Sequence, residues 1–248
     1  MPYQFVTESQ DYSDYSSGRV FYSLAGHPAF PVRLASEIFL RCCHHRQDLF
    51  GLTDPCHLYD PCSGAAYHLG VLGFLHGAAI SCVSASDVDE TAVTAARHNL
   101  DLLDPAGMEQ RIAGINRMIS LYGKESHRQA LESALVLQGR SNLPGGHKIK
   151  TDAFVSSALD AQALTVHLKD KPVDVVFTDV PYGQHSQWVH AAANPLGAML
   201  GALTGVLQHT AVIAVVSDKA QKAAHDGYRR IEQFQVGKRR VVILRLAD

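Results

Sequence analysis

The chain has 248 residues, of which 46% are hydrophobic and 19% are charged, and its formal net charge is −2. This length and apolar content fit one α/β domain with a stable core, and they exclude a disordered chain. The sequence contains no heptad repeat or low-complexity tract, which excludes fibrous classes. A net charge near zero argues against a nucleic-acid partner, unless the basic residues are clustered along the chain.

The N-terminal residues lack the basic start and apolar stretch of a signal peptide. The most apolar run, 69–85, contains His76, Gly and Ser, and it falls short of the roughly 20 apolar residues of a membrane-spanning helix. Five irregularly spaced cysteines favour a reducing compartment. The run Cys42-Cys43-His44-His45 cannot converge on one metal ion, because consecutive helix side chains diverge by about 100°. We therefore expect a cytoplasmic protein with no membrane partner and no metal.

Periodicity and turn residues predict an irregular lead-in at 1–30, followed by alternating helices and strands. These elements are a helix from residue 31, a strand 57–60, a helix 65–76, a strand 79–86 and a helix 89–103. Pro31 suits the first turn of a helix, and Asp89 suits a helix cap. The Asp104-Pro105 pair is expected to end the last of these helices.

Residues 105–146 interrupt the alternation. Met108, Ile112, Ile115 and Ile119 recur at helical spacing, and a second helix is predicted around 131–138 before a loop at 140–146. Alternation then resumes along the rest of the chain. The elements predicted there are a strand 148–151, a helix 156–167, a strand 173–178, a helix 188–208, a strand 211–216 and a hairpin of two strands, 228–235 and 239–246.

Repeated strand–helix units predict a mostly parallel sheet with helices on both faces, and the final hairpin adds an antiparallel strand. We predict one domain over 1–248, with a lead-in and helix at 1–56 and a helical insertion at 105–146. In such a sheet, ligands bind beyond the carboxyl ends of the strands. The residues that directly follow each strand are therefore the candidates for a site.

The first two strands are followed by candidate nucleotide-binding residues. The turn Asp60-Pro61-Cys62-Ser63-Gly64-Ala65-Ala66 lets the backbone approach a ligand at a helix N-terminus, although such turns also serve only to pack a helix on a strand. Asp87, twenty-three residues after Gly64, and the adjacent Val88 stand where dinucleotide folds hold ribose hydroxyls. The alternative for this acidic segment is a helix cap.

After the third predicted strand, Asp152 and Ala153 form a candidate adenine-binding position, where a carboxylate can accept a hydrogen bond from the amino group. A turn-forming Asp is the alternative. The fourth strand ends in Asp179-Val180-Pro181-Tyr182-Gly183. Proline fixes the backbone so that the Asp179 carboxylate and the Val180 carbonyl can face one pocket. With Tyr182 as a stacking ring, this arrangement fits a planar group that carries an exocyclic NH₂.

At these residues the sequence resembles the S-adenosylmethionine-dependent N-methyltransferases with an (Asn/Asp)-Pro-Pro-Tyr motif, and among them the RNA guanine-N2 enzymes. The whole chain resembles the avilamycin-resistance ribosomal RNA methyltransferases, which modify a guanosine of large-subunit RNA. The matching segments are Asp60 to Tyr67, Asp87-Val88-Asp89 with Ala92, Val93 and Asn99, Asp152, and Asp179 to Tyr182. Two residues depart from the motifs: Ala66 replaces a second glycine, and Val180 replaces the first proline.

The resemblance implies a class I, Rossmann-like methyltransferase fold and an enzyme that uses S-adenosylmethionine. It implies N-methylation of a guanine in large-subunit ribosomal RNA and resistance to an antibiotic. The loop from Asp60 to Ala66 would hold the methionine portion of the cofactor. Asp179, Val180, Pro181 and Tyr182 would form the catalytic motif.

The basic residues are clustered along the chain, so the low net charge does not argue against a nucleic-acid partner. Residues 105–150 carry seven basic and three acidic residues, for +4, and residues 219–248 carry eight basic and three acidic residues, for +5. The remainder carries −11, so the near-neutral total is a cancellation. Clustered cations favour RNA binding, for which the candidates are Arg111, Arg117, Lys124, Arg239 and Arg240. Solvated helix and hairpin faces are the alternative.

Several functions remain open on this evidence. An N-methyltransferase acting on adenine, a protein glutamine or a small molecule would use the same amide-like pocket. A dinucleotide-dependent oxidoreductase shares the fold, but the sequence lacks GxGxxG. An RNA-binding module with a degenerate pocket would bind no cofactor.

Overall fold

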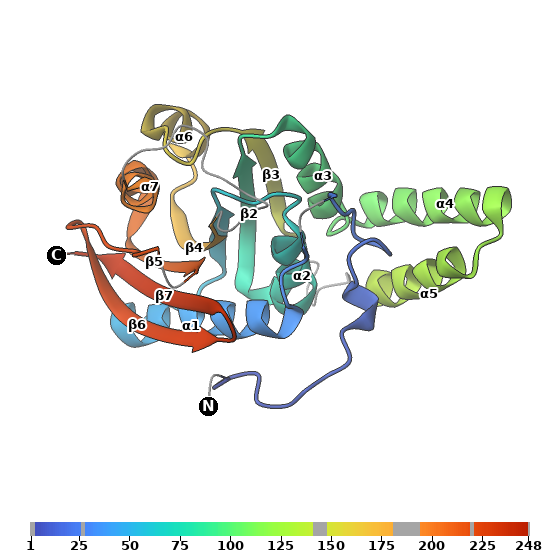
Figure 1. The fold of residues 1–248 in the computed structure, drawn as a ribbon, viewed down its shortest axis with the longest axis horizontal. Coiled ribbons are helices and arrows are strands. Elements are labelled where there is room, and N and C mark those ends of the chain that lie inside the picture. The colour runs from blue at the N-terminus through green and yellow to red at the C-terminus, as the bar shows by residue number, and fades with distance from the viewer. Residues whose placement is uncertain (1–2, 26–27, 141–147, 181–193, 219–220, 248) are drawn as a thin grey trace.

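The computed structural model describes residues 3–25, 28–140, 148–180, 194–218 and 221–247. Seven strands form one sheet in the order β3-β2-β1-β4-β5-β7-β6 (Figure 1). The strands are β1 (Cys56–Asp60), β2 (Ile80–Asp87), β3 (Lys150–Val155), β4 (Val173–Asp179), β5 (Leu207–Ser217), β6 (Tyr228–Val236) and β7 (Arg239–Leu246). Six strands run in one direction and only β7 is antiparallel to its neighbours, which confirms the expected mostly parallel sheet with an antiparallel last strand.

Helices cover both faces of this sheet. They are α1 (Val32–Phe50), α2 (Tyr67–His76), α3 (Glu90–Asp101), α4 (Pro105–Tyr122), α5 (Glu125–Arg140), α6 (Ala161–Leu168) and α7 (Pro195–Leu203), with short 3-10 turns at Ser13–Tyr15, Gly77–Ala79 and Thr204–Val206. In the part of the chain that is described, no helix is both long and apolar enough to cross a membrane.

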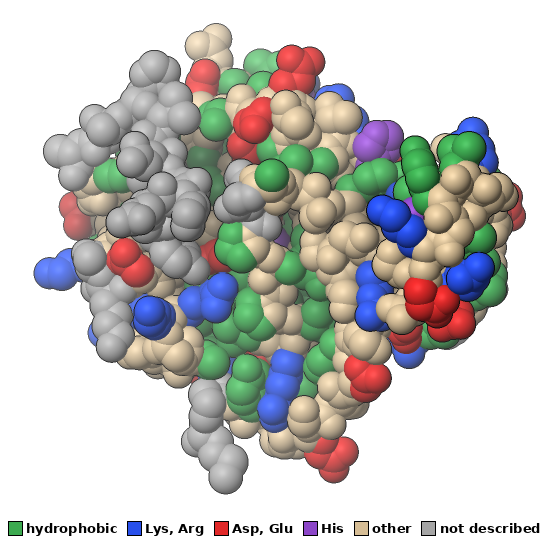
Figure 2. All heavy atoms as spheres, turned by 45° about the vertical axis from the view of Figure 1, so that its right-hand side comes forward, with side chains coloured by type: hydrophobic (Ala, Val, Ile, Leu, Met, Phe, Trp, Pro, Cys, Tyr) green, Lys and Arg blue, Asp and Glu red, His purple; other side chains and the backbone are tan. Residues whose placement is uncertain are grey.

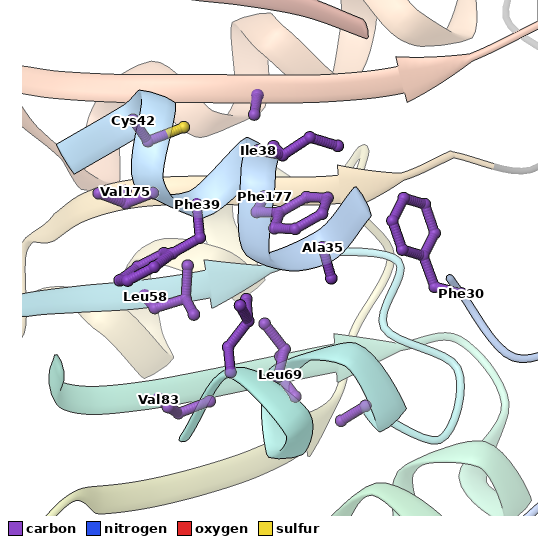
Figure 3. Close-up of a cluster of buried hydrophobic side chains, with 14 of the residues drawn as sticks. Phe30, Ala35, Ile38, Phe39, Cys42, Leu58, Leu69, Val83, Val175 and Phe177 are labelled. Atoms are coloured by element: carbon purple, nitrogen blue, oxygen red, sulfur yellow. The ribbon is translucent and has the colours of Figure 1, made fainter. Parts of the chain in front are cut away.

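The alternation of strand side chains divides the core into two layers. Leu58 and Phe177 face the side of the sheet covered by α1 and α2, where Phe39 of α1 belongs to the same cluster (Figure 3). Tyr59 and Val176, one position along each strand, belong to the cluster under α6 and α7. This is the two-residue period of a strand buried on both faces.

The structure confirms that the helix before Asp104-Pro105 ends there, since α3 stops at Asp101. The same pair begins α4, because the Asp104 side chain caps Ala106 N and proline fits the first helical turn. Several other boundaries differ from the sequence predictions. The third strand extends to Val155, well past the predicted end at residue 151. Within the described residues, the helix predicted at 188–208 is α7, which ends at Leu203 and is followed by the 3-10 turn Thr204–Val206 before β5 begins at Leu207.

The lead-in and the insertion form a third apolar cluster. Tyr15, Val20 and Phe21 of the lead-in are buried against residues of α2, α4 and α5, including Met108 of α4. The antiparallel helices α4 and α5 project beyond the sheet as an arm (Figure 1). The lead-in, expected to be irregular, therefore contributes core side chains at the root of this arm.

Candidate functional site

Three acidic residues lie at the carboxyl ends of three neighbouring strands. Asp60 is the last residue of β1, Asp87 of β2 and Asp179 of β4. These strands are adjacent and parallel in the order β2-β1-β4, so the three carboxylates reach the same edge of the sheet. That edge is where open α/β sheets bind their ligands. The structure thus brings together the strand-end carboxylates that the sequence predicted for a site.

The loop after β1 is held against the end of β2 by hydrogen bonds. Ser63 N donates to Ser86 O at 2.9 Å, and Gly64 N donates to Asp87 Oδ2 at 2.9 Å. The second carboxylate oxygen, Asp87 Oδ1, accepts from Asp89 N at 3.1 Å. Gly64 has a φ of +52°, a conformation that glycine adopts without steric cost. Each carboxylate oxygen can accept more than one hydrogen bond, so Asp87 can shape the loop and still bind hydroxyl groups.

Ala66 occupies a strained position at the end of this loop. It has a φ of +51° and alone has a positive φ among the non-glycine residues that are described. The left-handed conformation costs an L-residue about 1 kcal/mol. Ala66 is fully buried in the core and its carbonyl accepts from Gly70 N at 3.0 Å, in the first turn of α2. Packing and the start of the helix therefore hold Ala66 where the related motif has glycine.

Asp60 and His68 form a buried pair behind the loop. Asp60 Oδ1 accepts from Cys62 N at 2.9 Å, and Asp60 Oδ2 lies 3.3 Å from His68 Nε2. Full burial raises the pKa of Asp60 to about 8, assisted by the negative charges of Asp87 and Asp179 and opposed by the hydrogen bond from Cys62 N. Asp60 therefore holds a proton at neutral pH.

His68 was not singled out by the sequence analysis. It lies in the first turn of α2 and is fully surrounded by protein, so burial lowers its pKa to about 4. Its ring contacts Phe30 and Phe177, with centroids 5.7 and 4.8 Å away. In the sequence, its distinguishing signal is its position two residues after the small-residue loop.

Asp179 and Val180 lead from β4 toward the predicted catalytic motif. Asp179 Oδ1 is inaccessible to solvent, and Val180 N donates to Val216 O at 3.0 Å, which continues the pairing of β4 with β5. The Val180 side chain is almost completely buried. Pro181 and Tyr182 lie outside the described residues, so the predicted stacking ring is not placed.

The structure places Asp152 away from the strand ends. Because β3 continues to Val155, the residue level with Asp87 is Val155, and Asp152 is level with Ser84 in the body of β2. Its carboxylate Oδ2 lies 3.6 Å from Lys171 Nζ. The prediction that Asp152 follows the third strand is therefore wrong, and with it the basis for placing this carboxylate beside an adenine.

Ala153 is also in the body of β3, with its carbonyl accepting from Arg97 Nε at 3.0 Å. Both residues line a shallow pocket of about 210 Å³ between α3 and β3 instead of the strand-end edge. By contrast, Ser156 N, just past β3, donates to Asp87 O at 3.0 Å. The backbone after β3 thus lies beside the end of β2, through the main-chain carbonyl of Asp87, three residues later than the sequence indicated.

Comparison with known proteins identifies the family. The rRNA methyltransferase AviRa family matches residues 1–239. The chain is 36% identical over 247 residues to the 23S rRNA (guanine(2535)-N(1))-methyltransferase of Streptomyces viridochromogenes, which covers 99% of this chain and 96% of that protein. The chain belongs to the AviRa family of rRNA methyltransferases. Two solved structures of AviRa from the same organism superimpose with TM-scores of 0.86 and 0.87, at 36% and 35% identity, over 99% of this chain and 96% of those chains.

Family membership makes the chain a methyltransferase and confirms the class I fold. A methyltransferase needs a methyl donor, and the strand-end edge is where open α/β sheets bind their ligands. The residues of this edge suit a sulfonium cofactor, because the carboxylates of Asp87 and Asp179 end strands on either side of β1, and Asp87 binds the glycine-containing loop that follows β1. Val88, next to Asp87, is 46% exposed and offers an apolar surface at the same edge.

The run Cys42-Cys43-His44-His45 lies within α1, and its side chains have separate environments. Cys42 is in the core, and His44 Nε2 lies 3.1 Å from the carboxylate of Asp48. Over the described ranges, no three His, Cys, Asp or Glu side chains are grouped so that they could hold a metal ion.

The predicted RNA-binding residues occupy three different places. Arg117 and Lys124 are exposed on the arm. Arg239 and Arg240 are half-buried at the start of β7, and the Arg239 guanidinium lies 5.3 Å from the Phe30 ring centroid. Arg111, at the root of the arm, is bound to the lead-in. The five residues therefore come from three parts of the fold, and Arg111 is bound within the protein.

The contacts of Arg111 show what it does in this fold. Arg111 Nε donates to Val20 O and Nη2 donates to Arg19 O, both at 2.7 Å. The guanidinium also lies 4.3 Å from the ring centroid of Tyr22. Arg111 thus binds the lead-in to α4, and its guanidinium is engaged by two carbonyls and a ring of the protein itself.

Asn99, which the sequence interpretation matched to a motif without assigning a role, joins the lead-in to the loop after β1. Its Oδ1 accepts from Tyr22 N at 2.7 Å. Its Nδ2 donates to Tyr22 O at 3.0 Å and to Ala65 O at 2.8 Å. Because Asn99 is fully buried, this one amide ties two backbone segments of the site region together.

Proposed function

We propose that the chain transfers a methyl group from S-adenosylmethionine to N1 of a guanine in 23S rRNA. The observation that carries this proposal is the set of strand-end carboxylates Asp60, Asp87 and Asp179 in a chain 36% identical, over nearly its full length, to an enzyme named for that reaction. A ribosomal RNA substrate also implies that the enzyme works in the cytoplasm.

The loop of Asp60, Cys62, Ser63 and Gly64 would hold the methionine portion of the cofactor, which supplies an electrophilic methyl group on a sulfonium. Asp87 would accept hydrogen bonds from the ribose hydroxyls, and Val88 would contact the adenosine. We assign the adenine side to residues 155–156 in place of Asp152 and Ala153, because Val155 is level with Asp87 and is 47% exposed. The negative charges of Asp87 and Asp179 at this edge favour a cation, whereas Asp60 holds a proton.

The name of the relative changes the expected acceptor atom. The sequence interpretation assumed an exocyclic NH₂ group, whereas N1 of guanine is a ring nitrogen that carries one hydrogen. We propose that the Asp179 carboxylate accepts the N1 proton as the N1 electron pair forms the bond to the methyl carbon. The carbon–sulfur bond breaks with its electron pair left on sulfur, which yields S-adenosylhomocysteine. The Val180 carbonyl is proposed to accept from the adjacent amino group.

The target guanine must leave its base pair or already be unpaired, because N1 is otherwise hidden in the helix. Pro181 and Tyr182 are proposed to position the flipped base, with Tyr182 stacking on it. Holding the base and the methyl donor in line would supply much of the rate enhancement. Arg239 and Arg240, in a segment of net charge +5, are proposed to contact RNA phosphates.

The test uses 23S rRNA transcribed in vitro, tritiated S-adenosylmethionine and reverse transcription across the product. A methyl group on N1 blocks Watson–Crick pairing, so a new stop should appear at one guanine, and nuclease digestion should yield N1-methylguanosine. Label on adenine, on the guanine amino group, on protein glutamine or on a small molecule would contradict the proposal. Cells that express the chain should also tolerate more avilamycin than cells that express Asp179→Asn.

A further inference from the structure

The tip of the arm, residues 116–129, contains no buried residue. The last buried residue of α4 is Ile115 and the first of α5 is Ala130. The partly buried Met118 and Ile119 still pack against the cluster at the root, so the end of α4 with Leu121 and Tyr122 extends about 5 Å beyond that packing, at 1.5 Å per residue. The arm projects away from the sheet (Figure 1). Nothing in the packing of the sheet requires the side chains of this tip.

Those side chains are nevertheless apolar and basic in character. Leu121 is 73% exposed and Tyr122 is 65% exposed, at the end of α4 just before the turn at Gly123. The Tyr122 ring is supported by an edge contact with His127, whose ring centroid is 6.0 Å away. The acidic residue of the tip, Glu125, is paired with Arg128 at 3.2 Å.

Within the tip, Arg117, Lys124 and Arg128 outnumber Glu125 by a net charge of +2, on a chain whose total charge is −2. Figure 2, where the arm comes forward, shows blue Lys and Arg side chains beside green hydrophobic ones on its surface. Exposed aromatic rings among cations are the combination with which proteins bind unpaired bases: the ring stacks on a base and the cations face phosphates.

We propose that the arm tip is a second RNA contact, in which Tyr122 stacks on an unpaired base and Arg117 and Lys124 face the backbone. This inference rests on the proposed function, because it takes ribosomal RNA as the partner. The base is distinct from the methylated guanine, because the tip lies on a separate projection from the strand-end edge (Figure 1). The tip thus contributes to the affinity for RNA and to the position of the RNA on the enzyme, and it takes no part in methyl transfer.

The test measures the Kd of transcribed 23S rRNA for Tyr122→Ala, Tyr122→Phe and a matched control, Val166→Ala. Val166 of α6 is also 65% exposed but has no place in the tip. Tyr122→Ala should raise Kd about tenfold, the range measured for loss of one stacked base. Tyr122→Phe, which keeps the ring, and Val166→Ala should bind like the wild type. Photocrosslinking from benzoylphenylalanine at position 122 should label an RNA site other than the target guanine.

Unchanged binding of Tyr122→Ala would overturn the proposal, and so would equal losses in Tyr122→Ala and Tyr122→Phe, since stacking does not need the hydroxyl. If Tyr122→Ala weakens binding only to assembled large subunits and not to naked RNA, the tip contacts a protein and the RNA assignment is wrong. Methyl transfer by the wild type is measured separately. If the wild type binds 23S rRNA through Tyr122 but transfers no methyl group, the proposed function fails and this inference survives.

Discussion

The strand-end site and the arm are built in opposite ways. At the site, Asp60 is fully buried and Asp87 is engaged by backbone N–H groups of its own loop. At the arm tip, Leu121 and Tyr122 stand in solvent with few protein partners. Between them, Arg111 and Asn99 bind the lead-in to the arm root and to the site loop. Substitutions at the site should therefore alter the rate of methyl transfer, substitutions at the tip should alter RNA affinity, and substitutions between them should alter stability.

The largest effect on the rate of methyl transfer is expected for Asp179→Asn, a variant that separates catalysis from RNA affinity. The amide keeps the shape of the side chain but cannot accept the N1 proton, so single-turnover methyl transfer to 23S rRNA should fall about 10³-fold. The Kd for the RNA should stay within about twofold of the wild type.

The matched control is Asp152→Asn. Asp152 was predicted from the sequence to belong to the same site, but its carboxylate faces Lys171 in the body of the sheet. Its transfer rate should remain near the wild-type value. Comparable losses in the two variants would show that the strand-end geometry does not decide which carboxylate acts.

Asn99→Ala should have the next largest effect and would test whether the lead-in supports the site. The substitution leaves the buried Tyr22 N, Tyr22 O and Ala65 O without their partner. The free energy of unfolding in urea should fall by about 3 kcal/mol, and the Kd for S-adenosylhomocysteine should rise several-fold because the loop is released. Asn116→Ala, at an exposed position of α4, should change stability by less than about 0.5 kcal/mol. If both variants were equally stable, the lead-in would not support the site.

The sequence predicted the site better than the connections that support it. Asp60, Asp87 and Asp179 could be found because a strand followed by a turn is visible as a local pattern. Asp152 was misplaced because the end of a strand depends on pairing, here with Ser84 to Asp87 of β2, and pairing is not a local property. Within its described residues, the lead-in is irregular as predicted, apart from one 3-10 turn, but its buried place could not be foreseen because it depends on hydrogen bonds with Arg111 and Asn99, both distant in sequence. Long-range hydrogen bonds of this kind leave no periodic signal.

A pH titration of stability would isolate Asp60. An unfolded Asp has a pKa of about 3.9, and burial raises that of Asp60 to about 8, so the folded state holds a proton that the unfolded state releases. Stability contributed in this way is lost as the pH rises toward 8. The pKa of His68 is lowered to about 4, so His68 costs stability only below about pH 6.5.

The window between pH 6.5 and 8 therefore reports on Asp60. There the free energy of unfolding of the wild type, relative to Asp60→Asn, should fall by up to about 1.4 kcal/mol per pH unit. Urea denaturation of both proteins at several pH values measures the difference. If the free energies of unfolding of the two proteins changed with pH in parallel, Asp60 would be ionised throughout this range and its pKa would not be raised.

The smallest effects should separate the root of the arm from its tip. Arg111→Gln removes hydrogen bonds from a charged group to two carbonyls, so the free energy of unfolding should fall by about 1.5 kcal/mol. Arg117→Gln, on the same helix but exposed, should change it by less than about 0.5 kcal/mol. In RNA binding, Arg117→Gln should have the larger effect. It should reduce the slope of log K for RNA binding against log salt concentration by about 1, as expected for one lost phosphate contact. Arg111→Gln should leave this slope unchanged. If Arg111→Gln lowers the slope and spares stability, the root belongs to the RNA surface, and two arginines six residues apart share one role.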